Sequence, residues 1–209
     1  MKTSIRILFG LLLMAAGTLS QAQNNANDLI KRTVKTIRDP KNVEMIFTYH
    51  FSSDASSPLI EKHEGTACLQ GEAYKIVMDE QETISDGKTI WTYLKDDEEV
   101  MVSDAAEGND NTPLKLLTTL DKDYTAKYMG KDKEGLTIIE LSTQKGLYKK
   151  VTVKIDEKKG KLKEATIHAD DGSTLNILIT EWKRNQDLKD GFFSFDEKAH
   201  PEAEIIDMR

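Results

Sequence analysis

The chain has 209 residues, and its 36 acidic and 29 basic side chains give a formal net charge of −7 at pH 7. This acidic balance argues against nucleic acid or an anionic lipid surface as a partner, because both repel negative charge. The one cysteine, Cys68, excludes an intrachain disulfide and a thiolate metal cluster, and is expected to be a small buried side chain. The length suits a single domain with its own core.

The start of the chain has the pattern of a secretory signal peptide. Lys2 and Arg6 provide a basic beginning, and a short apolar run follows them. The run is too short to cross a bilayer as a helix, and small residues fit a cleavage site after Ala22. We therefore expect residues 1–22 to be a cleaved leader and residues 23–209 to be one exported domain. An uncleaved anchor is the alternative.

The exported part is expected to begin with a short amphipathic helix, because apolar side chains recur at helical spacing over residues 29–37. This helix should end before Pro40. Alternation of apolar and polar residues then predicts a strand over residues 43–51 with one strongly apolar face. A second long strand is expected over residues 61–69, and Gly65 in its interior is typical of a sharp bend in a curved sheet.

Residues 84–100 hold the clearest turn signal of the chain. Asp86-Gly87 lies between runs rich in β-branched and aromatic residues. It predicts a hairpin with a type I′ turn, in which both central residues have positive φ. Trp91 and Tyr93 share one face of the strand that follows, but the pattern does not show which face is concave.

The second half of the chain is expected to hold one helix and four or five strands. An acidic loop over residues 103–112 leads to Pro113, which favours a helix start, and leucines follow at near-helical spacing up to Leu120. The tail from Asp187 onward is expected to be looser. Glycine-containing turns separate these strands. These strands are centred on residues 124–129, 136–141, 148–155, 162–168 and 175–182.

About eleven short strands at hairpin spacing and only two helices argue against a parallel β-α-β fold. A large antiparallel sheet must bury one face. Two helices are too few to cover a flat sheet of this size, so the sheet should curl on itself. We therefore predict a mainly β fold, a half-open antiparallel β-barrel lidded by helices, with an apolar concave side lined by alternate residues of each strand.

The residues that could carry catalysis are scattered. The four histidines, His50, His63, His168 and His200, form no cluster in sequence. A metal site between His50 and His63 is conceivable, but no third ligand is spaced to join them. Paired aspartates fit turn chemistry better than a calcium loop. We therefore expect no enzyme activity, no metal and no cofactor, and a hydrolase remains the weakest alternative.

Binding to apolar ligands is better represented, because large adaptable side chains alternate along the predicted strands. An ordinary filled core stays open as the alternative, since periodicity does not show whether a buried face is filled. The lid helices carry Leu29, Val34, Leu114 and Leu117. The candidates for lining an apolar, lipid-binding cavity are Met45, Phe47, Tyr49, Tyr74, Ile76, Met78, Trp91 and Tyr93.

The Asp-Gly-Lys hairpin with its Trp91, about twenty residues after the strand that contains Gly65, resembles the outer-membrane lipoprotein carrier family, LolA. The likeness in layout covers most of the exported chain. It implies an unclosed barrel lidded by helices, without catalysis, that carries triacylated lipoproteins through the periplasm. It further implies an inner-membrane release transporter and an outer-membrane acceptor as partners, and a cavity-facing role for Tyr74 and Ile76. We expect a monomer.

One position departs from the family pattern. Gln70-Gly71 stand where better-studied carriers have an Arg-Pro pair whose arginine pairs with the lid. Neither residue can make a charge-assisted, two-pronged hydrogen bond, so we expect the lid to be held by apolar packing of its helices. A second class of function stays open: a lipid-occupancy sensor or adaptor of envelope-stress signalling with the same fold.

Overall fold

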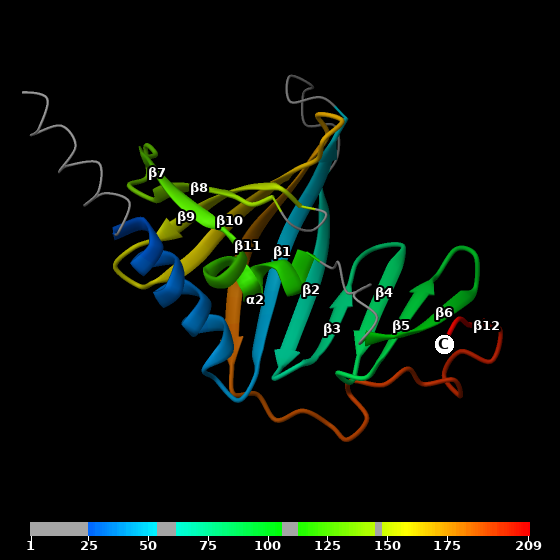
Figure 1. The fold of residues 1–209 in the computed structure, drawn as a ribbon. Coiled ribbons are helices and arrows are strands. Elements are labelled where there is room, and N and C mark those ends of the chain that lie inside the picture. Colours follow the sequence, from blue (N-terminus) through cyan, green and yellow to red (C-terminus); the bar gives the residue numbers. More distant parts are fainter. Residues whose placement is uncertain (1–24, 54–61, 106–112, 145–147) are drawn as a thin grey trace, which may run out of the picture.

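The computed structural model describes residues 25–53, 62–105, 113–144 and 148–209 (Figure 1). The expected leader, residues 1–22, lies outside the described residues. Twelve strands of the described part form one sheet, in the order β12-β6-β5-β4-β3-β2-β1-β11-β10-β9-β8-β7. Among these strands the two edges, β12 and β7, do not pair with each other, so the sheet is open. The predicted half-open, mainly β architecture is confirmed.

One arm of the sheet extends from the central strand toward β12. Neighbours within it pair antiparallel, except that β12 lies parallel to β6. The strands of this arm are β1 (Val43–Ser52), β2 (His63–Gln70), β3 (Ala73–Val77), β4 (Gln81–Ser85), β5 (Thr89–Leu94), β6 (Glu99–Asp104) and β12 (Glu204–Asp207).

The other arm begins on the opposite side of β1 and is antiparallel throughout. Its strands agree with the sequence-based prediction to within about two residues at most ends. They are β7 (Thr125–Lys131), β8 (Thr137–Ser142), β9 (Lys150–Asp156), β10 (Lys161–His168) and β11 (Thr174–Arg184).

Both helices lie on the same side of the curved sheet (Figure 1). The N-terminal helix is described over residues 25–38, and α2 spans Pro113–Asp123. The N-terminal helix buries Leu29, Ile30 and Val34, each at most 4% exposed, in the main core between helices and sheet. No helix in the described ranges has the length and apolar character needed to cross a bilayer.

The turn at Asp86-Gly87 differs from the prediction. It is a hairpin turn between β4 and β5, but only Gly87 has positive φ, so the type I′ assignment is wrong. The reason is side-chain capping, because Asp86 Oδ1 accepts hydrogen bonds from the backbone N–H groups of Lys88 and Thr89, both at 2.8 Å. This arrangement fixes a three-residue turn in which one glycine suffices.

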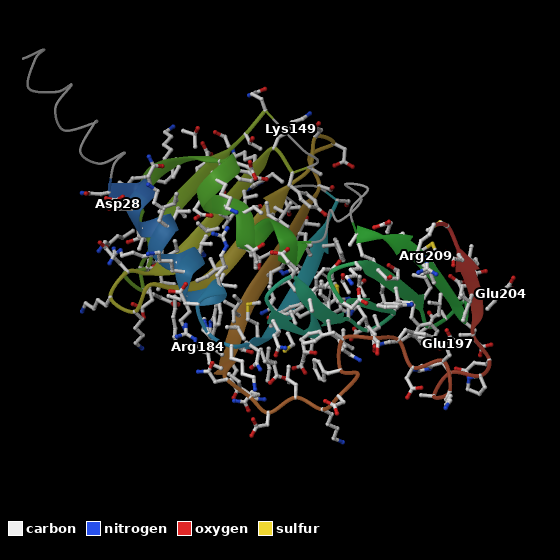
Figure 2. All side chains as sticks on the ribbon, turned by 60° about the horizontal axis from the view of Figure 1, so that its bottom comes forward. Asp28, Lys149, Arg184, Glu197, Glu204 and Arg209 are labelled. Atoms are coloured by element: carbon white, nitrogen blue, oxygen red, sulfur yellow. The ribbon has the colours of Figure 1, made fainter. Side chains whose placement is uncertain are left out.

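The C-terminal segment also differs from the expected loose tail. It leaves β11, runs past the lower ends of the neighbouring strands in the view of Figure 1, packs Phe195 against Tyr93 and ends as the edge strand β12. Its beginning is fastened by the buried Asn42, which exchanges two hydrogen bonds of 2.8 Å with the backbone of Gln186. Figure 2 shows Glu197, Glu204 and Arg209 at the β12 end of the molecule, far from Asp28 at the N-terminal helix.

Candidate functional site

The cross-strand register decides which face of each strand is concave. Residues paired directly across two antiparallel strands lie on the same face of the sheet. One such row follows the pairs Met45–Ala67, Ala67–Ile76, Ile76–Thr83 and Thr83–Thr92. Its members at β1, β2 and β3 belong to the core beneath the helices, so the row marks the concave face.

An apolar cavity of about 100 Å³ lies between this concave face and α2. We call it the apolar cavity. Leu114 and Leu117 of α2, two of the candidate lid residues, are part of its lining. Of the eight candidate cavity residues, five line it: Met45, Phe47, Tyr49, Ile76 and Met78.

Strand β11 supplies part of the lining that sequence reasoning missed. Leu175, Ile177 and Ile179 point into the apolar cavity. Their spacing of two residues was visible in the sequence. This spacing could have identified them as one apolar face of β11. The register then places that face beside the apolar face of β1, because Tyr49 pairs with Ile177 and Phe47 pairs with Ile179.

Gly65 permits the position of Phe47 in the cavity wall. The two residues are cross-strand partners. A Cβ atom at Gly65 would lie 2.6 Å from two ring atoms of Phe47 and 3.1 Å from the carbonyl oxygen of Val77. The glycine therefore leaves space for an aromatic ring to lie flat across the neighbouring strand.

Tyr74 does not line the apolar cavity but a second space beside it, of about 310 Å³. We call this space the amphipathic pocket, because apolar and charged side chains meet in it. Leu69 and Tyr74 form its apolar floor, while Arg38, Thr118 and Lys122 lie at its helical side. Tyr74 itself is 3% exposed, so it is part of the concave core.

Trp91 and Tyr93 lie outside both spaces. They alternate with Thr92, so they occupy the convex face, where Tyr93 forms a separate cluster with Val100 and Val102. The C-terminal segment covers this cluster. The ring of Tyr93 lies 5.6 Å from that of Phe195 and 4.7 Å from that of His200.

The two residues of the N-terminal helix that were expected to belong to a lid, Leu29 and Val34, are buried in the main core. A charged contact adds to this apolar packing. Arg38 donates two hydrogen bonds to the carboxylate of Asp121, at 3.2 and 2.9 Å, and a further one to the carbonyl oxygen of Thr118. Apolar packing alone was therefore an incomplete prediction, because an arginine from another position joins the two helices.

Polar side chains also lie next to Tyr49, which is one of the residues that line the apolar cavity. Its ring stacks on that of His63 at 5.3 Å, and Nδ1 of His63 lies 2.6 Å from Asp79 Oδ2. Burial raises the pKa of the Tyr49 hydroxyl. Gln81, which is exposed, is a polar residue of the cavity lining.

The structure does not bring together the two histidines considered as metal ligands. His63 pairs with Tyr49, whereas His50 follows Tyr49 in β1 and therefore lies on the opposite face. Among the described residues, no group of three or more His, Cys, Asp and Glu side chains could hold a metal ion. Cys68 is buried as expected, and burial, with the nearby Glu44, raises the pKa of its thiol to about 11.

The family model and the similar proteins of known name all describe outer-membrane lipoprotein carriers. Residues 78–196 match the family model of the outer membrane lipoprotein carrier protein LolA. The chain is 33% identical over 116 residues to an outer-membrane lipoprotein carrier protein of Pasteurella multocida (strain Pm70). It is 28% identical over 130 residues to one of Haemophilus influenzae. These matches span 56% and 62% of this chain, and equal shares of the two relatives, so the chain matches little more than half of their length.

The fold has a solved counterpart in an uncharacterized conserved protein from Thermus thermophilus. The two structures superpose with a TM-score of 0.59 over 88% of this chain and 99% of the other, at 11% sequence identity. At this identity the likeness concerns the fold alone.

Proposed function

Because the chain belongs to the LolA family of outer-membrane lipoprotein carrier proteins, we propose that it shields the acyl chains of lipoproteins in its apolar cavity and carries them through the periplasm toward the outer membrane. In this proposal residues 1–22 are the secretory leader, and residues 23–209 act as a monomeric carrier domain. A release transporter in the inner membrane and an acceptor at the outer membrane are its partners. The observation that supports it best is the apolar cavity beneath α2.

The physical task explains why such a cavity is needed. Burying one methylene group is worth about 0.8 kcal/mol. An acyl chain of ~15 methylenes therefore resists leaving a membrane by roughly 12 kcal/mol. A protein can move such a chain through water only by offering comparable apolar surface. No covalent step is required, and Cys68 lines neither the apolar cavity nor the amphipathic pocket.

The size of the apolar cavity indicates that the described conformation is a closed form. Its volume is about 100 Å³. An engineered apolar cavity of ~150 Å³ accepts only a molecule as small as benzene. A long acyl chain can therefore enter only after α2 moves away from the sheet. Loading and release are thus coupled to the position of this helix.

The carrier activity can be tested by extraction from membranes. The purified protein is incubated with vesicles that contain a triacylated lipopeptide, and the soluble fraction is analysed by native mass spectrometry. We expect a soluble complex with one lipopeptide, and none with the same peptide lacking its acyl chains. A protein that leaves the lipopeptide in the vesicles, or that binds both peptides equally, would contradict the proposal. A stable protein partner in place of lipidated cargo would favour the sensor alternative.

The site of binding can be tested by filling the apolar cavity. Ala67→Phe places a ring in the cavity, because Ala67 lines it. Thr66→Phe is the matched control, since the neighbouring residue of β2 points to the convex face. We expect Ala67→Phe alone to weaken binding of a fluorescent fatty acid, with both variants checked for folding by circular dichroism.

A further inference from the structure

One side chain separates the two spaces beneath the helices. Leu114 lines both the apolar cavity and the amphipathic pocket. It belongs to the first turn of α2 and is 4% exposed. A leucine side chain therefore lies where the two spaces meet.

The floors of the two spaces are successive parts of the same concave face. Leu69 pairs with Tyr74 under the amphipathic pocket, and Ala67 pairs with Ile76 under the apolar cavity. The two pairs are two residues apart along β2, a distance of roughly 6.6 Å in a strand. Leu114 is common to the two linings and thus lies above the boundary between these two parts of the face.

The two spaces differ in the polarity of their walls. Arg38, Glu72 and Lys122 bring charged groups to the amphipathic pocket, and Thr118 and Thr119 add hydroxyl groups. The apolar cavity is lined by aliphatic and aromatic side chains, with Gln81 and Thr83 as its amide and hydroxyl groups. A molecule that occupied both would place a polar part in the first space and a hydrocarbon chain in the second.

We propose that Leu114 divides a single channel for an acyl chain, in which the polar head of the ligand lies in the amphipathic pocket and the chain passes Leu114 into the apolar cavity. This inference rests on the proposed function, because it assumes an acylated ligand. Leu114 is then the residue that controls entry of the chain into the inner part of the channel.

The contacts of α2 agree with a movement at this end of the helix. Asp121, in its last turn, is held by Arg38. Leu114 lies about two turns earlier, a separation of roughly 10 Å along the helix. The first turn can therefore move away from the sheet while the last turn keeps its ion pair.

The orientation of the ligand is tested by photo-crosslinking with palmitate analogues that carry a diazirine either at the methyl end or next to the carboxylate. We expect the methyl-end probe to label β1 or β11, and the carboxylate-end probe to label α2 or the turn between β2 and β3. Reversed labelling would overturn the orientation. Confinement of both probes to the amphipathic pocket would overturn the passage beyond Leu114.

The role of Leu114 is tested with Leu114→Ala against Leu116→Ala. Both variants truncate a buried leucine of α2, but Leu116 lines neither space. If the open form of the wild-type protein makes up about a tenth of the population, removal of the barrier raises the apparent affinity for palmitate by up to about tenfold. We expect this gain, with faster association in stopped-flow fluorescence, for Leu114→Ala alone.

The outcomes distinguish a failure of the role of Leu114 from a failure of the carrier function. Equal association rates and affinities in the two variants, with wild-type binding intact, would overturn the role of Leu114 and leave the carrier function standing. No binding of palmitate or triacylated lipopeptide to the wild-type protein would overturn the proposed function itself.

Discussion

Arg38 and Asp121 join the two helices that cover the concave face. The guanidinium group binds both carboxylate oxygens, at 3.2 and 2.9 Å, and the partners are 83 positions apart in sequence. Their side chains are 33% and 17% exposed, so the pair is partly screened by water. The planar fork of the arginine still gives the contact a direction that apolar packing lacks.

Loss of this pair should loosen the last turn of α2. We expect Arg38→Ala to accelerate amide hydrogen exchange there in the empty protein, and a double-mutant cycle with Asp121→Ala to give a coupling of about 1 kcal/mol. Lys35→Ala, which removes an exposed cation of the same helix, is the control. Hydrogen exchange with mass spectrometric detection measures the effect. Unchanged exchange in Arg38→Ala would show that apolar packing alone holds this end of the helix.

Gly65 should be intolerant of a side chain for one identifiable reason. Its Cβ would lie 2.6 Å from the ring of Phe47, and such overpacking typically costs about 1–3 kcal/mol. We expect Gly65→Ala to lower the free energy of unfolding in urea by this amount. The double variant Gly65→Ala/Phe47→Leu should cost less than the sum of the two single changes, because leucine vacates the space. Additive effects would mean that the ring is not the obstacle.

The sequence predicted best what depends on neighbours along the chain. Alternation identified the apolar face of β1, and Pro113 is the first residue of α2. The sequence did not predict which face of the sheet a strand residue occupies, because that depends on how the strands pair. Trp91 and Tyr93 are large apolar residues two positions apart, as Met45 and Phe47 are. Only the register across β4 and β3 places Trp91 and Tyr93 on the other face of the sheet.

Two contacts between segments that are distant along the chain could not be predicted from the sequence either. The pair of Arg38 and Asp121 requires the ends of two helices to meet, and neither residue stands in a motif. Strand β12 is four residues long and pairs in parallel with β6, so it carries no hairpin signal. The Ile205-Ile206 pair was its only apolar mark.

Cys68 should react slowly with thiol reagents in the folded protein. Burial and the neighbouring Glu44 raise the pKa of the thiol from 9.0 to about 11, so little thiolate forms at pH 8. Because the folded pKa is the higher one, this stabilisation is complete below about pH 9 and is lost as the pH rises toward 11. We expect the unfolding free energy of the wild type to fall by on the order of 2 kcal/mol more than that of Cys68→Ala across this window.

This difference is measured by urea unfolding of both proteins between pH 8 and pH 11, a range that contains the expected window. The comparison removes the contribution of the tyrosines and lysines that titrate in the same range, since both proteins contain them. Parallel pH profiles of the two proteins, or rapid labelling of the folded wild type at pH 8, would contradict a buried, neutral thiol.

Two tyrosines on opposite faces of the sheet allow a direct test of which face binds the ligand. Tyr49 lines the apolar cavity, whereas Tyr93 packs beneath Phe195 and His200 of the C-terminal segment. We expect Tyr49→Ala to weaken palmitate binding by about tenfold, which corresponds to about 1.4 kcal/mol of lost contact.

Tyr93→Ala should leave the affinity within about twofold of the wild type, because the Tyr93 side chain touches no ligand. It should instead speed amide exchange over residues 195–203, whose packing it removes. Fluorescence titration and hydrogen exchange on both variants measure these two effects. Equal loss of affinity in Tyr93→Ala, without faster exchange in the segment, would mean that the ligand reaches the convex face.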